Sequence, residues 1–168
     1  MITVRAERPG DEAAIHAVNE AAFRDHPHSE GMEPFIVDAL RADGDLALSL
    51  VAEADGAIAG HAAYSKAILS NGDDGWFTLG PIAVLPDRQG QGVGRALMEA
   101  GERHWREAST KGIVLLGDPA LYARFGFVRD TPLHITGPLA EYFQVLAFTD
   151  AVPEASVTFA RAFALRPS

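Results

Sequence analysis

Three glycines alternate with larger residues in the segment Gln89-Gly90-Gln91-Gly92-Val93-Gly94. The segment follows an apolar strand pattern that ends at Leu85, and it opens a helical pattern that reaches His104. Glycine lets the backbone turn tightly and approach a ligand closely, because it has no Cβ. Free N–H groups at a helix N-terminus, together with the helix dipole, favour a bound phosphate. The segment therefore predicts a strand, a glycine turn and a phosphate-binding helix start, to which Arg88 and Arg95 add positive charge.

The spacing of these glycines argues against two other phosphate-binding loops. A dinucleotide fold needs Gly-x-Gly-x-x-Gly, whereas this spacing is Gly-x-Gly-x-Gly and an antiparallel pattern precedes it. A nucleotide triphosphate loop needs Gly-Lys followed by Ser or Thr, and the segment contains no lysine. A glycine-rich turn that binds nothing is the remaining alternative.

The first half of the chain shows the two-residue alternation of antiparallel strands. Strand patterns cover residues 3–7, 46–52, 57–69 and 76–85, with turn signals at 55–56 and 71–75. Asp11 opens a helix, and Pro34 stands near the start of a second one, where its missing N–H costs nothing. These patterns predict an antiparallel meander, with two helices inserted after the first strand.

The second half of the chain adds a crossover connection. The helix after the glycine segment has an expected buried face of Val93, Leu97, Ala100 and His104. A short apolar strand at residues 113–116 follows this helix, and a strand, a helix and a second strand in this order predict parallel neighbours. Helical turns near 120–124 and strands near 142–148 and 157–164 complete the pattern. We therefore predict an α+β fold, with a mixed sheet flanked by helices, in a single domain over residues 1–168.

The composition narrows the function classes. The chain has 168 residues, no cysteine and a formal net charge of −9. Without cysteine, disulfides, thiolate catalysis and cysteine metal sites are excluded. An acidic surface disfavours nucleic acid and anionic membranes, and it favours cationic partners such as amines. No apolar run approaches the ~20 residues that span a bilayer, and the charged start of the chain is not typical of a secretory signal, so we expect a cytoplasmic protein.

The glycine segment and its neighbours resemble the GNAT acetyltransferase superfamily. The family signature is Gln or Arg, two residues, Gly, one residue, then Gly or Ala at a helix start, and Gln89, Gly92 and Gly94 stand at those places. Residues 79–86 and 95–98 resemble the family's fourth strand and pyrophosphate loop, and residues 115–119 and 121–127 resemble its fifth strand and following helix. The resemblance covers residues 4–130 and is greatest to a stand-alone bacterial branch. Leu121 departs from the many relatives that carry tyrosine there.

The resemblance implies where a cofactor lies. In this family the fourth and fifth strands are parallel and splay apart, and the pantetheine arm of acetyl-CoA pairs with backbone between them, as an added strand would. The amides of residues 89–95 would then hold the pyrophosphate. The complete implied set for acetyl-CoA is Ile82, Ala83, Val84, Gln89, Gly90, Gln91, Gly92, Val93, Gly94, Arg95, Gly117, Tyr122 and Phe125.

Family position and chemistry both select Tyr122 as the general acid. A thiol has a pKa of about 8.5 and tyrosine of about 10, so a tyrosine at the sulfur stays protonated and can give its proton to the leaving thiolate. A backbone N–H near residues 83–84 would polarise the carbonyl. The identity of the general base stays open, because residues 76–84 contain no acidic side chain. The candidates for taking the amine proton are Glu33, His61 and a chain of water molecules.

We therefore expect N-acyl transfer from acetyl-CoA to a primary amine by direct attack. The acceptor is a small-molecule amine or a protein amine. The alternative is a regulatory GNAT-like module that binds acyl-CoA without turnover. The absence of an acidic residue from the strand at residues 76–84 favours this alternative, and the presence of Tyr122 argues against it. Exchange of a C-terminal strand or edge pairing would make a homodimer. No metal is expected, because His26 and His28 lie in a loop without matched further ligands.

Overall fold

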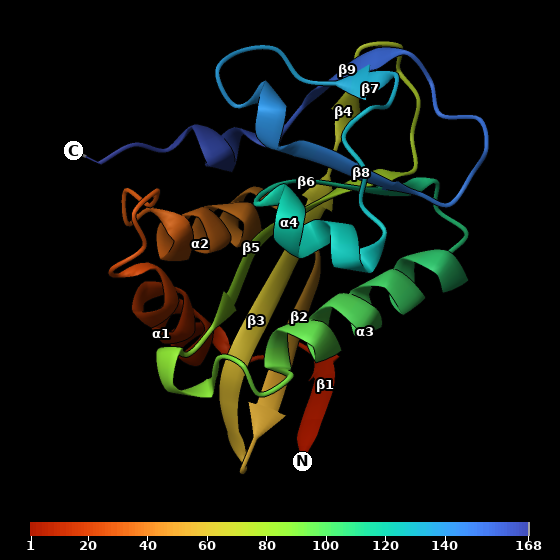
Figure 1. Ribbon diagram of the computed structural model, residues 1–168. Coiled ribbons are helices and arrows are strands. Elements are labelled where there is room, and N and C mark those ends of the chain that lie inside the picture. The colour runs from red at the N-terminus through yellow and green to blue at the C-terminus, as the bar shows by residue number, and fades with distance from the viewer. Residues whose placement is uncertain (168) are drawn as a thin grey trace.

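The computed structural model describes residues 1–167. Its main sheet has six strands in the order β1-β2-β3-β5-β6-β8. Helices α1 and α2 cover one face of this sheet and α3 covers the other (Figure 1). The strands of the main sheet are β1 (Ile2–Ala6), β2 (Leu46–Ala54), β3 (Ala57–Lys66), β5 (Trp76–Val84), β6 (Gly112–Leu116) and β8 (Phe143–Ala147). The helices are α1 (Glu12–Phe23), α2 (Glu33–Asp43), α3 (Val93–Glu107) and α4 (Pro119–Tyr122), with 3-10 helices η1 (Pro86–Arg88), η2 (Ala123–Phe125), η3 (Ala140–Tyr142) and η4 (Arg161–Ala164).

The strands carry a separate apolar core on each face, because successive residues of a strand point to opposite sides. Val51 of β2 packs with Ile15 of α1 and Leu40 of α2. The next residue, Ala52, packs in the core that contains Leu97 of α3. This arrangement confirms the predicted α+β fold with a mixed sheet between helices. No helix among residues 1–167 is both long and apolar enough to cross a membrane.

The predicted antiparallel meander is confirmed for β1, β2, β3 and β5, whose neighbouring pairs are all antiparallel. The predicted continuous strand over residues 57–69 is wrong, because the chain leaves the main sheet at Ala67. The N–H of Ala67 donates to the carbonyl of Trp76, and the short β4 (Ile68–Leu69) then pairs with β9 (Ala155–Thr158). β4, β9 and β7 (Leu133–His134) form a second, three-stranded sheet at one end of the molecule (Figure 1).

β5 and β6 are the pair of parallel strands that the sequence predicts. They correspond to the family's fourth and fifth strands, and their numbers are one higher here because the short β4 precedes them. Their pairing is short and covers only the register Trp76–Gly112, Phe77–Ile113 and Thr78–Val114. Beyond Thr78, β5 remains paired with β3, whereas β6 is paired along its whole length with β8. The two strands therefore separate after Thr78, and the main sheet has an opening along the second half of β5.

The predicted buried face of α3 is partly wrong. Val93 and Leu97 are buried as expected, but His104 is exposed and Ala100 is only partly buried. Trp105 is buried in place of His104, because its ring stacks on Phe77 with 3.9 Å between the ring centroids. The complete set of buried residues on α3 is Val93, Leu97, Met98, Gly101 and Trp105.

The C-terminal part of the chain agrees with the predictions only in its first strand. β8 confirms the strand expected near residues 142–148. The strand expected over residues 157–164 is wrong, because β9 ends at Thr158 and η4 follows. In η4, Ala162 is buried in the core beneath α2, and Arg161 pairs with Asp43 at the end of α2. Contacts with α2 therefore decide the path of this segment.

Candidate functional site

The glycine segment forms an open turn at the start of α3. Gly90 and Gly92 have φ angles of +76° and +92°, which are unfavourable for residues with a Cβ. A Cβ at Gly90 would meet nothing within 4 Å, and Gly92 is the N-cap of α3 without a side chain to bond the first amides. The N–H groups of the first turn have no partner within the helix, so they are free to donate to a ligand. The structure thus confirms the glycine turn and the helix start that the sequence predicts, and anion binding there stays a prediction.

The two glutamines of this segment brace the turn with their side chains. Nε2 of Gln89 donates to the carbonyl of Val84 at 3.2 Å, and Nε2 of Gln91 donates to the carbonyl of Asp87 at 3.0 Å. Arg88 is paired with Asp55 of the β2–β3 turn at 2.9 Å, whereas Arg95 is exposed.

Ile82, Ala83 and Val84 lie on β5 beyond the point where it leaves β6. These residues pair with β3 on one side, in the register Ala62–Ile82, His61–Ala83 and Gly60–Val84. Alternate backbone groups of a strand point to opposite edges, so the other edge of this segment carries donors and acceptors that β6 does not use. That free edge runs toward the glycine turn, and its end at Val84 contacts the position of a Cβ on Gly94 at 3.8 Å.

Tyr122, Gly117 and Phe125 gather after the C-terminal end of β6. Oδ1 of Asp118 caps α4 by accepting the N–H of Ala120 at 2.9 Å, and α4 then ends at Tyr122. A Cβ at Gly117 would be only 2.4 Å from Cε2 of Tyr122, so the glycine makes room for the ring. Tyr122 and Phe125 both pack against the core beneath α3.

The hydroxyl of Tyr122 keeps its proton at neutral pH. Burial raises its pKa above the ordinary value, and the negative charge of Asp118 raises it further. The ring also stands edge-on to Phe127, with 6.0 Å between centroids, which restricts its orientation. A restrained and protonated phenol has the properties of a proton donor.

Glu33 begins α2 and lies in a small pocket of about 230 Å³ between α1 and α2. Its Oε1 accepts a hydrogen bond from the hydroxyl of Ser29. The pocket is lined by Asn19, Glu20, Phe23, Arg24, Gly31, Glu33 and Pro34. Two carboxylates and one guanidinium give it a net acidic lining. Within residues 1–167, no hydrogen bond or ion pair joins Glu33 to Tyr122, so the two predicted catalytic residues are held by different elements.

Residues 45–129 match the family model of the acetyltransferase (GNAT) domain. The chain belongs to the GNAT family. A GNAT family acetyltransferase from Brucella melitensis, solved in complex with acetyl-CoA, is 45% identical to it with a TM-score of 0.85, over 97% of this chain and 98% of that chain. The GNAT N-acetyltransferase YhbS of Escherichia coli, solved in complex with CoA, has the same TM-score at 34% identity, over 98% of this chain and 92% of that one.

Two curated relatives point to the same enzyme class. The uncharacterized N-acetyltransferase YhbS of Escherichia coli K12 is 37% identical over 125 residues, or 74% of this GNAT chain and 72% of that protein. The mycothiol acetyltransferase of Streptomyces avermitilis is 35% identical over 135 residues, which cover 75% of this chain but only 42% of that protein. The predicted family and the predicted class of N-acetyltransferase are confirmed.

His61, the second candidate base, is buried inside this GNAT fold and unsuited to the role. It is 0% exposed, its Nε2 lies 2.8 Å from the hydroxyl of Ser49, and its Nδ1 lies 3.3 Å from Nδ2 of Asn19. Burial lowers the pKa of His61 to about 4. Both ring nitrogens are engaged, so no acceptor amine can reach the ring. The sequence pointed to the histidine but gave no sign that Asn19 is its neighbour. Asn19 is buried because α1 packs against the sheet.

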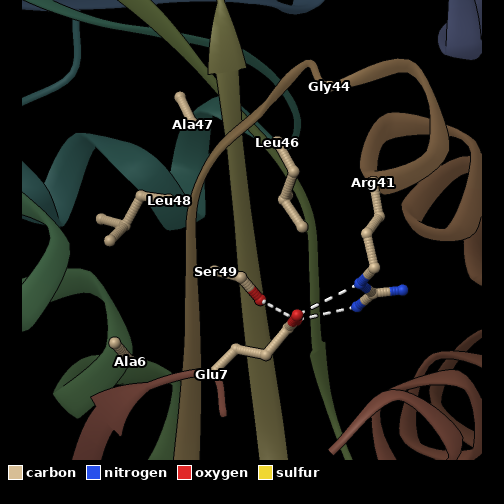
Figure 2. Close-up of a pocket in the computed structure, with 8 residues that line it drawn as sticks. All are labelled: Ala6, Glu7, Arg41, Gly44, Leu46, Ala47, Leu48 and Ser49. Carbon is tan, nitrogen blue, oxygen red and sulfur yellow. Dashed lines mark hydrogen bonds and ion pairs between the residues drawn. The ribbon is translucent and has the colours of Figure 1, made fainter. Parts of the chain in front are cut away.

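A hollow of about 390 Å³ is lined by none of the predicted site residues. Figure 2 shows the residues around it. It opens beside the end of β1 and the start of β2, where Glu7 accepts hydrogen bonds from Arg41 at 2.7 Å and from Ser49 at 2.7 Å. Its lining is Ala6, Glu7, Arg41, Gly44, Leu46, Ala47, Leu48 and Ser49. The polar side chains of this hollow are engaged with one another, which indicates a structural role.

His26 and His28 lie in the loop between α1 and α2, with 5.9 Å between their ring centroids. Nδ1 of His26 accepts the backbone N–H of His28 at 3.2 Å. In the part of the chain that the structure describes, no group of three or more His, Asp or Glu residues is placed to hold a metal ion.

Proposed function

We propose that residues 1–168 act as one GNAT domain that transfers an acetyl group from acetyl-CoA to a primary amine. The observation that carries the proposal is the opening after Thr78, where β5 leaves β6 and keeps a free backbone edge. The uncapped start of α3 stands at one end of this edge. Complexes of the similar Brucella melitensis and Escherichia coli proteins with acetyl-CoA and CoA support the choice of donor.

The residues at the opening fit acetyl-CoA. The first amides of α3 suit a pyrophosphate, because Gly90 and Gly92 leave no Cβ between the backbone and the ligand. Arg95 adds an exposed positive charge. The free edge formed by residues 82–84 suits the amide groups of a pantetheine arm, which would pair with it as an extra strand. When bound there, acetyl-CoA supplies a thioester whose C–S bond breaks as a C–N bond forms.

Tyr122 is the proposed general acid. Its raised pKa keeps the phenol protonated, and the departing sulfur takes that proton to leave as a thiol. Solvent then restores the proton on Tyr122. Removal of a general acid costs roughly 100-fold to 10,000-fold in rate. Phe125 and Gly117 are proposed to shape the surroundings of the phenol, because both lie in the segment that carries it.

Glu33 is the proposed proton acceptor for the amine. An alkyl ammonium group loses one proton before attack and a second as the amide forms, so the acceptor side needs a route for protons to water. Glu33 is partly exposed in an acidic pocket, which also attracts a cation. His61 is no longer a candidate for this step, because it is buried. The small-molecule or protein nature of the amine stays a prediction, as does a homodimer.

The proposal is tested by ligand binding and by turnover. At about 100 times its dissociation constant, a ligand that binds only the folded state stabilises it by about 2.7 kcal/mol. We expect acetyl-CoA and CoA to raise the Tm, and NADH to leave it unchanged. Tyr122→Phe should keep the Tm shift and lose turnover in an amine screen that detects free thiol. A Tm shift without any turnover of the unaltered protein would favour the non-catalytic acyl-CoA-binding module, and no Tm shift at millimolar acetyl-CoA would contradict both.

A further inference from the structure

The C-terminal helix η4 is fixed to the body of the protein next to the opening between β5 and β6. Nε and Nη2 of Arg161 donate to the two carboxylate oxygens of Asp43 on α2, at 2.9 and 2.7 Å. The neighbouring Ala162 is 2% exposed and packs in the core between α2 and the sheet. This segment lies beyond the residues that match the GNAT domain, so the family alone does not assign it a role.

The position of η4 places Phe163 against β5. A Cβ on Gly80 would be 3.7 Å from Cε1 of Phe163, which is van der Waals contact. Gly80 follows Thr78, the last residue of β5 that pairs with β6, by two positions. The ring of Phe163 is partly exposed and packs against Phe159, with 5.9 Å between centroids. Phe163 therefore borders the opening on the side of the sheet that α2 covers.

Phe163 packs against an apolar cluster that also contains residues of α2, the helix that begins at Glu33. Ile36 of α2 lies in the same apolar cluster as Phe163. Ile36 comes three residues after Glu33, and residues at i and i+3 are neighbours on the surface of a helix. Glu33 thus stands about one helical turn from Ile36, and the apolar cluster that Ile36 packs against also receives Phe163.

We propose that Phe163 is a specificity-determining residue, which forms an apolar wall of the acceptor site. The inference rests on the proposed acetyl transfer and names the class of acceptor. A primary amine that carries a hydrocarbon or aromatic group fits this border, with its ammonium group toward Glu33 and its carbon atoms against Phe163. The ring of Phe163 would remove apolar surface of such an amine from water, and the free energy gained is proportional to the area removed. A small polar amine would gain less.

The test compares two acceptors on the full-length protein. Phenethylamine carries an aromatic group, and ethanolamine is small and polar. We expect Phe163→Ala to lower kcat/KM for phenethylamine about 10-fold or more and to change the value for ethanolamine by less than about 3-fold. The KM for acetyl-CoA should stay the same. Phe163→Leu, which keeps an apolar side chain, should recover most of the loss, and it serves as the second variant where alanine weakens folding.

Phe35→Ala is the matched control. Phe35 is an exposed aromatic residue of α2, and its ring packs edge-on against His16, with 5.2 Å between centroids. This control should leave the ratio between the two acceptors unchanged. An unchanged ratio in Phe163→Ala, or an equal loss for both acceptors, would overturn the inference. A failure of acetyl-CoA to stabilise the unaltered protein would instead show that the proposed function itself is wrong.

Discussion

Replacing Gly117 by alanine should displace the ring of Tyr122 and lower turnover, although Tyr122 itself is not substituted. A Cβ at residue 117 would lie 2.4 Å from Cε2, 2.9 Å from Cδ2 and 3.4 Å from Cζ of Tyr122. Carbon atoms prefer separations of about 3.5–4.0 Å, so the ring must move by roughly 1 Å. A displacement of that size at a reacting group costs about 100-fold in rate. We expect Gly117→Ala to lower kcat by about 100-fold.

The binding of acetyl-CoA should change far less than turnover. The proposed pyrophosphate site at Gly90 and Gly92 belongs to a different segment, so the dissociation constant should stay within about 3-fold of its starting value. Thermal unfolding should show a cost of about 1–3 kcal/mol, the usual range when a methyl group is added to a packed site. Stopped assays at saturating acetyl-CoA give kcat, and thermal-shift titration gives the affinity.

A double-mutant cycle decides whether the effect passes through the phenol. Tyr122→Phe already lacks the hydroxyl, so adding Gly117→Ala to it should lower kcat by less than about 3-fold further. Residues that act as a unit show such non-additivity, whereas independent sites add. The reasoning would be refuted if Gly117→Ala kept full kcat. It would equally fail if the change cost the same 100-fold in both backgrounds.

Three other predictions concern stability and binding. Because the pKa of His61 is about 4 when folded and about 6.5 when unfolded, the unfolded chain binds more protons between these values. Stability should therefore fall by about 3 kcal/mol as the pH drops from 6.5 to 4, and urea unfolding of His61→Asn should lack this part of the pH dependence. Gly112→Ala places a Cβ 2.5 Å from the carbonyl oxygen of Leu146 and 2.5 Å from Cζ3 of Trp76, so thermal unfolding should show a loss of about 3 kcal/mol, and an unchanged Tm would contradict the packing. Gly92→Ala has space for its Cβ but an unfavourable φ of +92°, so titration should show about 10-fold weaker acetyl-CoA binding, whereas equal affinity would argue against this turn as the pyrophosphate site.

The predicted secondary structure around the proposed site is confirmed where the signal is local. The glycine turn, the start of α3 and the crossover to β6 follow from residue types and spacing within about thirty positions of one another. The capping of α4 by Asp118 is local as well. The residues proposed for acetyl-CoA and the general acid could therefore be selected from the sequence, and their roles stay predictions until they are measured.

The errors occurred where partners lie far apart in the sequence. β4 leaves the main sheet because β9 is available to pair with it, and the hydroxyl of Ser70 accepts the N–H of Ser156 across 86 positions. Similarly, the ring of Phe77 stacks on Trp105, so Trp105 occupies the buried face of α3. His104, the residue before it, is exposed as a result. A pattern read along the chain contains no information on such neighbours.

By itself, the sequence determined the periodicity of its strands and helices and the backbone freedom of its glycine turn. These are properties of a residue and its near neighbours, so they survive without knowledge of the fold. Only the tertiary structure decided that β5 separates from β6 after Thr78, that His61 is a buried and neutral residue, and that Phe163 lies on Gly80. Each of these depends on which distant segment removes water from the residue or takes its hydrogen bonds, and this is decided when the whole chain packs.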